Sequence, residues 1–174
     1  AVPGSVLWLL DDNPAATRNL LAAAAARNAD PARLIFAPRV APADHLARHR
    51  FADLFLDTLP YNAHTTASDA LWAGLPVVTC PGAAFDGRVA ASLLSTIGLP
   101  ELVTHSLQDY EALALVLAGD TTRLAALRET LARNRTQSPL FDTDRFRRNI
   151  EAAYLRMLDV HRRGEPAKSF PLSE

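Results

Sequence analysis

The sequence contains one cysteine and one lysine among its 174 residues. Cys80 alone cannot form an internal disulfide or a cysteine-rich zinc site, and such low cysteine usage is typical of proteins in reducing compartments. We therefore expect a cytoplasmic protein. Lys168 lies close to the carboxyl end, and every other Lys or Arg position is an arginine. A catalytic or binding site that needs a lysine within the fold would therefore require a lysine from outside these 174 residues.

Long hydrophobic runs and a strong excess of one charge are also absent. No apolar run approaches the roughly 20 residues that span a bilayer, and the first residues lack the pattern of a signal peptide. The 18 basic and 19 acidic residues give a net charge of −1, which excludes a strongly basic nucleic-acid-binding module. With 49% hydrophobic residues the composition is that of a folded globular protein. We expect neither a membrane nor a nucleic acid among its partners.

Motifs of several enzyme classes are missing as well. The sequence has no Gly-x-Gly-x-x-Gly of dinucleotide-binding folds and no Gly-x-Ser-x-Gly of serine hydrolases. His45 and His49 are four residues apart, but they lack a third ligand at metal-binding spacing. We therefore expect no metal ion and no cofactor.

Short apolar segments alternate with longer segments of helical periodicity over the first hundred residues. The expected strands cover residues 6–10, 34–36, 54–56, 77–79 and 102–103, and we expect the strand at 6–10 to be buried. The expected helices between them cover residues 14–27, 42–50, 65–72 and 87–97. Because the strands are continuously apolar, this alternation predicts an α/β fold, a Rossmann-like parallel sheet with helices on both faces. Beyond residue 104 the pattern is helical, so we divide the chain into a core at 1–104, C-terminal helices of the same domain at 105–164 and a tail at 165–174.

Ligands of parallel sheets bind outside the carboxyl ends of the strands, which selects the loops 37–45, 58–66 and 80–88. The segment from His64 to Asp69 is the most informative of these. Thr65 and Thr66 at a helix start, with free backbone N–H groups, predict an anion site, and Asp69 four residues after Thr65 could accept from ribose hydroxyls. An alternative is a capping box, in which Thr66 and Asp69 only stabilise the helix start.

Two basic residues follow the second expected strand on one helix face. His45 could stack on a base with Arg48 beside it, or both could belong to a solvated helix surface. No residue is a convincing general base, although His64 lies within reach of the expected site.

In the segments around His45, Arg48 and His64–Asp69, the sequence resembles the protein O-linked N-acetylglucosamine transferases. The resemblance covers the chain to about residue 163. Its most specific block is residues 62–76, Asn-Ala-His-Thr-Thr-Ala-Ser-Asp-Ala-Leu-Trp-Ala-Gly-Leu-Pro. It implies the C-terminal nucleotide-binding domain of a GT-B glycosyltransferase, whose first strand–helix unit would precede this chain. It also implies roles for seven residues: Val40 and His45 at the uracil, Arg48 supporting that loop, His64 near the sugar, Thr65 and Thr66 at the pyrophosphate, and Asp69 at the ribose.

The resemblance further implies an inverting, metal-independent enzyme that transfers N-acetylglucosamine from UDP-GlcNAc to Ser or Thr of an acceptor protein. The N-terminal half of such an enzyme would supply tetratricopeptide repeats, the first GT-B domain and the donor-binding lysine, so we expect these 174 residues alone to be inactive. Two alternatives remain open. One is a UDP-glucose-dependent protein N-glucosyltransferase of the same family, and the other is a non-catalytic nucleotide-sugar-binding protein.

Overall fold

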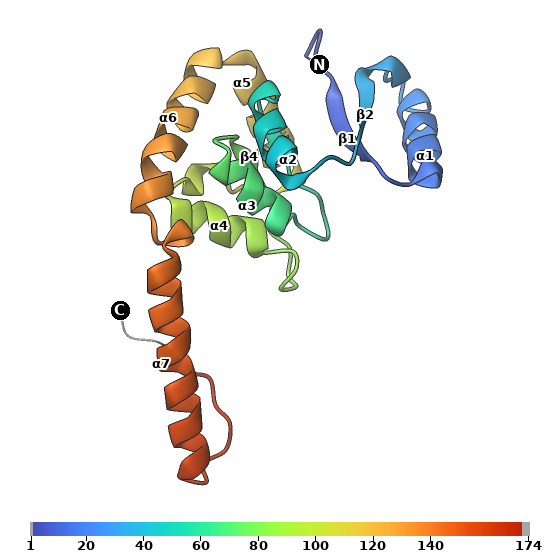
Figure 1. Cartoon of the computed structure of the whole chain (residues 1–174). Helices are drawn as coiled ribbons and strands as arrows, with labels where there is room; N and C mark the ends of the chain where they lie inside the picture. The colour runs from blue at the N-terminus through green and yellow to red at the C-terminus, as the bar shows by residue number, and fades with distance from the viewer. Residues whose placement is uncertain (1, 172–174) are drawn as a thin grey trace.

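The computed structural model describes residues 2–171, as two layered parts followed by a long projecting helix (Figure 1). The first part is a β-α-β unit. Strands β1 (Leu7–Asp11) and β2 (Leu34–Pro38) pair in parallel, with Leu7 opposite Leu34, and helix α1 (Pro14–Ala25) connects them. The side chain of Asn13 accepts hydrogen bonds from the N–H groups of Ala15 and Ala16, which confirms the expected helix start.

The second part repeats the parallel arrangement around a larger core. Helix α2 (Pro42–Arg48) and a short 3-10 helix (His49–Phe51) lead to β3 (Phe55–Leu56), α3 (Thr65–Trp72), β4 (Val77–Val78) and α4 (Val89–Ile97). Strands β3 and β4 pair in parallel. The fifth expected strand is reduced to a single parallel bridge between Thr79 and Val103, because a 3-10 helix occupies Pro100–Leu102.

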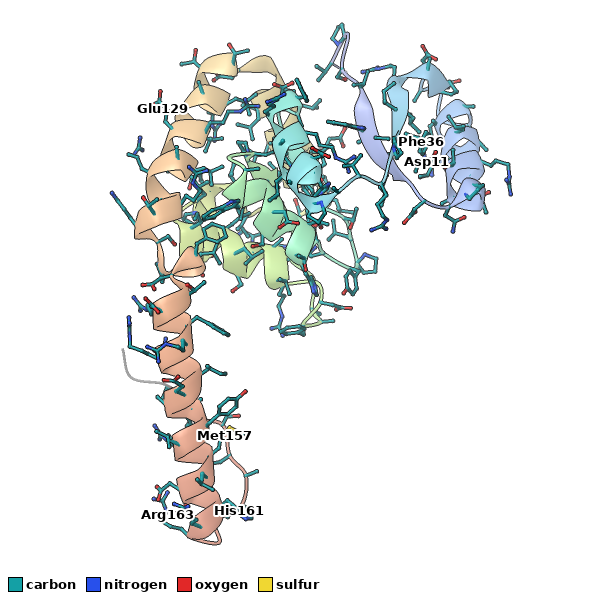
Figure 2. All side chains as sticks on the ribbon, in the orientation of Figure 1. Asp11, Phe36, Glu129, Met157, His161 and Arg163 are labelled. Atoms are coloured by element: carbon teal, nitrogen blue, oxygen red, sulfur yellow. The ribbon has the colours of Figure 1, made fainter. Side chains whose placement is uncertain are left out.

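Three helices complete the chain. Helices α5 (Leu107–Gly119) and α6 (Thr121–Gln137) pack on the second part, and α7 (Thr143–Arg162) extends away from it (Figure 1). Met157 and His161 stand out from α7 at the far end from the core (Figure 2). The described part of the expected tail lies along α7, where the Arg156 guanidinium is 4.6 Å from the centroid of the Phe170 ring. Residues 172–174 of that tail lie outside the described residues.

The hydrophobic core lies in the second part. Its members are apolar side chains of α3, β4, α4, α5 and α6 that are almost fully removed from water, among them Leu71, Val78, Leu94, Leu117 and Leu131. Burial on this scale is the main driving force for folding. The loops that follow β3 and β4 are therefore anchored on the part of the molecule that contains this core.

The α/β class and the parallel pairing are confirmed, but the strands form two separate pairs rather than one continuous sheet. The prediction that residues 6–10 form a buried strand was wrong. Trp8 is 38% exposed and Leu10 42% exposed, because β1 has only β2 as a neighbouring strand and α1 contributes no buried side chain. No helix among residues 2–171 combines the length and the apolar character needed to cross a membrane.

Candidate functional site

The amino end of α3 offers hydrogen-bond donors that the helix does not use. The first hydrogen bond of the helix runs from the Ser68 N–H to the His64 carbonyl, at 3.1 Å. The N–H groups of Thr65, Thr66 and Ala67 therefore have no partner inside the helix. The N-cap position belongs to His64, and its side chain makes no capping hydrogen bond. The capping-box alternative is wrong, because Thr66 lies inside the helix rather than at its N-cap.

A buried carboxylate holds the loop that leads to this helix end. Asp57 directly follows β3 and is 4% exposed. Its Oδ1 accepts hydrogen bonds from the N–H groups of Thr58 at 2.8 Å and Ala63 at 2.7 Å, and its Oδ2 accepts one from Thr79 Oγ1 at 2.6 Å. The Tyr110 hydroxyl donates to the Asp57 carbonyl at 2.9 Å. Burial, followed by the charge of Asp57, raises the pKa of Tyr110 to about 12.

The loop after β4 closes against the same segment. The Asp86 carbonyl accepts from the Asn62 N–H at 3.0 Å and from His64 Nε2 at 3.1 Å. Because a carbonyl only accepts, Nε2 carries the proton and Nδ1 of a neutral His64 ring is left as an acceptor. Gly87 permits this close approach, since a Cβ there would lie 2.9 Å from the Pro60 carbonyl oxygen.

Two aromatic rings accompany His64. The Tyr61 ring stacks on the imidazole with centroids 4.8 Å apart and an interplanar angle of 17°, and Phe85 approaches edge-on at 6.3 Å. Tyr61 is 58% exposed and Phe85 is 76% exposed. An exposed apolar platform thus borders the helix end, and analysis of the sequence alone did not single it out.

His45 and Arg48 form a cluster that connects the two parts of the molecule. Arg48 Nη2 donates to His45 Nδ1 at 2.8 Å, and Arg48 Nη1 donates to the Pro38 carbonyl at the end of β2 at 3.0 Å. The Arg48 guanidinium also lies 5.5 Å from the centroid of the Trp8 ring on β1. The alternative of a simple solvated helix face is wrong for Arg48, whose side chain is tied to both strands.

The pKa of His45 is lowered, and several neighbouring groups contribute to this shift. Partial burial lowers the pKa of His45 below 6.5, and the positive charges of His49 and Arg48 lower that pKa further, whereas the charge of Asp69 raises it. The side chains of Thr65, Thr66 and Asp69 make no hydrogen bond to other described residues, and both threonines are exposed. Val40 is 38% exposed in the turn between β2 and α2.

The structure therefore brings most of the residues singled out in the sequence to one edge of the molecule. Backbone donors and two hydroxyls at the start of α3 suit a phosphate group, and a neutral imidazole beside a carboxylate suits a nucleoside. No three His, Cys, Asp or Glu side chains among residues 2–171 are grouped so that they could hold a metal ion. The absence of a metal requirement stays a prediction.

Comparison with known proteins gives consistent matches. The sequence pattern of the glycosyl transferase family 41 matches residues 1–150. A probable UDP-N-acetylglucosamine–peptide N-acetylglucosaminyltransferase of Arabidopsis thaliana is 38% identical over 99% of this chain. A UDP-N-acetylglucosamine–peptide N-acetylglucosaminyltransferase of Caenorhabditis elegans is 36% identical over 95% of it.

A solved structure of similar shape is the K341M mutant of the Thermobaculum terrenum O-GlcNAc transferase. It superposes with a TM-score of 0.81 at 38% identity, covering 87% of this chain and 30% of that one. The chain spans 18% of the length of the Arabidopsis relative and 14% of that of the Caenorhabditis relative.

Replacing Asp57 should destabilise the protein strongly. Asp57→Ala leaves two backbone N–H groups and the Thr79 hydroxyl without their acceptor, so we expect the free energy of unfolding to fall by about 2–4 kcal/mol. Denaturant unfolding measures this loss. Asp44→Ala is the control, because Asp44 is an exposed acid with no capping hydrogen bond, and should change stability by less than about 0.5 kcal/mol. Equal effects of the two substitutions would contradict the role of Asp57.

The titration of His45 should be displaced to low pH. We expect an NMR titration midpoint below 6.5, raised by Arg48→Gln and lowered further by Asp69→Asn, because these variants remove charges of opposite sign. Since folded His45 binds protons less readily than the unfolded chain, acidification below about pH 6.5 should decrease the free energy of unfolding. Movement of the midpoint in the same direction by both variants would contradict this arrangement.

Proposed function

The chain belongs to the glycosyl transferase family 41, and we propose that it forms the UDP-binding part of an inverting enzyme that transfers N-acetylglucosamine from UDP-GlcNAc to Ser or Thr of proteins. The observation that supports this most strongly is the start of α3. Unused N–H groups and the Thr65 and Thr66 side chains form an anion site there, with His45, Arg48 and Asp69 alongside. The relatives named above are, by their names, two peptide N-acetylglucosaminyltransferases and an O-GlcNAc transferase.

The nucleoside would lie against the cluster on α2. The neutral imidazole of His45 offers an aromatic face for the uracil, and Arg48 fixes that ring through the hydrogen bond to its Nδ1. Val40, in the turn that Arg48 anchors through Pro38, would present its backbone to the base edge. Asp69 has no other partner among the described residues and would accept hydrogen bonds from the ribose hydroxyls.

The diphosphate would lie at the helix end, and the sugar beyond it near His64. In the transfer, the acceptor hydroxyl oxygen forms a bond to the anomeric carbon while the bond from that carbon to the diphosphate oxygen breaks. Negative charge then grows on the leaving UDP, and Thr65, Thr66 and the free N–H groups would stabilise that charge. Positioning would supply much of the remaining acceleration. A lysine would be added from outside this chain, in which Lys168 pairs with Glu165 near the far end of α7.

The sugar itself would contact the platform of His64, Tyr61 and Phe85. The apolar face of a pyranose ring packs well on exposed aromatic rings, and Tyr61 and Phe85 are the exposed rings beside His64. His64 Nδ1 remains an acceptor at this position, so His64 could receive the proton of the acceptor hydroxyl. No metal ion takes part in this proposal, and the acceptor protein and an N-terminal catalytic half are its partners.

The transfer activity is tested by product analysis. The full-length protein is incubated with UDP-GlcNAc or UDP-glucose and a panel of Ser-, Thr- and Asn-containing peptides, and intact masses are recorded. We expect an added N-acetylhexosamine on Ser or Thr peptides. Glucose on Asn peptides would replace the proposal by the N-glucosyltransferase alternative, and UDP binding without any product would indicate a non-catalytic nucleotide-sugar-binding protein.

The nucleoside contacts are tested by two variants. His45→Ala should weaken UDP binding by about 1–2 kcal/mol, the scale of one stacking contact on a base. Asp69→Asn should also weaken UDP binding, and both variants should leave inorganic pyrophosphate binding nearly unchanged because pyrophosphate has no nucleoside. Calorimetry on the full-length protein measures both ligands, with His161→Ala on the exposed side of α7 as the control. Equal losses for UDP and pyrophosphate would count against these roles.

A further inference from the structure

A second concave surface lies at the opposite end of α3. It is a pocket of about 250 Å³ between the 3-10 helix His49–Phe51, the last turn of α3 and the middle of α6. An eight-residue helix is about 12 Å long, so this pocket is about that far from the proposed diphosphate site at the start of α3. None of the residues assigned to UDP lines it.

The lining of this pocket is strongly basic. It includes Arg50, Arg128, Arg135 and His49, and it includes no acidic side chain. Among residues 2–171, the one acidic group in contact with these arginines is Asp53, whose Oδ1 lies 3.6 Å from Arg128 Nη2 and which is itself exposed. Glu129, the neighbour of Arg128 in sequence, points outward from α6, away from the body of the protein (Figure 2).

Arg50 supplies the unpaired guanidinium of this pocket. Arg128 Nη2 donates to the Ala52 carbonyl at 2.6 Å, and Arg128 Nε is buried from solvent, so neither atom is offered to a ligand. Arg50 lies over the Phe51 ring at 4.7 Å and makes no hydrogen bond to the described residues.

The third arginine, Arg135, reduces the negative charge that the carboxyl end of α3 presents to the pocket. The carboxyl end of a helix carries partial negative charge, which would repel a negatively charged ligand. Arg135 Nη1 donates to the Trp72 carbonyl in the last turn of α3 at 3.2 Å, and its guanidinium lies 5.2 Å from the Trp72 ring centroid. This contact offsets the local negative charge and holds the guanidinium at the pocket wall.

We propose that this pocket binds the phosphate group of a small phosphorylated molecule, at a site separate from the nucleotide site. Planar guanidinium groups bind phosphate oxygens through paired N–H donors, and three arginines line this pocket. Leu131, Ala132 and the Trp72 ring supply an apolar wall beside the charges. The volume exceeds what a bare phosphate ion fills, which favours a phosphate monoester with a small organic part.

The test uses the full-length protein with UDP present at saturation, so that the proposed nucleotide site is occupied. Inorganic phosphate, O-phosphoserine and acetate are titrated separately, and binding is followed by ³¹P NMR for the first two and by amide shifts for all three. The decisive variants are Arg50→Gln and Arg135→Gln. The matched control is Arg133→Gln, an exposed arginine of α6 that donates to Thr130 and does not line the pocket.

We expect millimolar or tighter binding of both phosphates, with O-phosphoserine the tighter, and much weaker binding of acetate. Each pocket variant should weaken phosphate binding about tenfold, the loss that follows removal of one charge-assisted hydrogen bond, and Arg133→Gln should change it less than twofold. Inorganic phosphate binding as tightly as O-phosphoserine would identify the free ion as the ligand and overturn the monoester. Displacement by UDP, equal weakening by Arg133→Gln, or equal binding of acetate would each overturn the site.

Discussion

The carboxylate of Asp57 is the interaction on which the rest of the candidate site depends. It is buried at the carboxyl end of β3 and accepts three hydrogen bonds through its two oxygens. Two come from backbone N–H groups of the loop after β3, at Thr58 and Ala63, and the third comes from Thr79, which directly follows β4. A charge in this position is tolerated only because those donors replace water. The path of the loop then fixes where α3 begins, and with it the direction in which the unused N–H groups point.

The same constraint links the aromatic platform to the helix end. His64 follows the Ala63 N–H that Asp57 holds, and the His64 ring is fixed from the other side by the Asp86 carbonyl. The imidazole is therefore oriented by two loops that belong to adjacent strands of one parallel pair. A rigid strand pair with polar loops at its carboxyl ends is the usual arrangement of ligand sites in parallel sheets.

The sequence predicted the local structure well and the distribution of burial less well. Helix starts such as Asn13 and Thr65 follow from local chemistry, and the placement of His45, Thr65 and Asp69 near one edge follows from the strand-end rule. The exposure of β1 depends on which neighbours the strand has, and an apolar pattern such as that around Trp8 does not report it. The sequence did not point to a role for Asp57, because a lone acid after a strand gives no sign of the hydrogen-bond donors that will surround it.

The contacts of Arg48 connect the proposed nucleoside site to the junction between the two parts of the molecule. This side chain holds the Pro38 carbonyl, the Trp8 ring and the His45 imidazole, and so it belongs at once to the β-α-β unit and to the part that contains the core. Element contacts across this junction are sparse compared with those inside each part. A ligand that binds at His45, as proposed, would therefore also act on the junction between the two parts, and ordering that junction would cost part of its binding free energy. In the proposed complex, the affinity for the base and the order of this junction would therefore be thermodynamically linked.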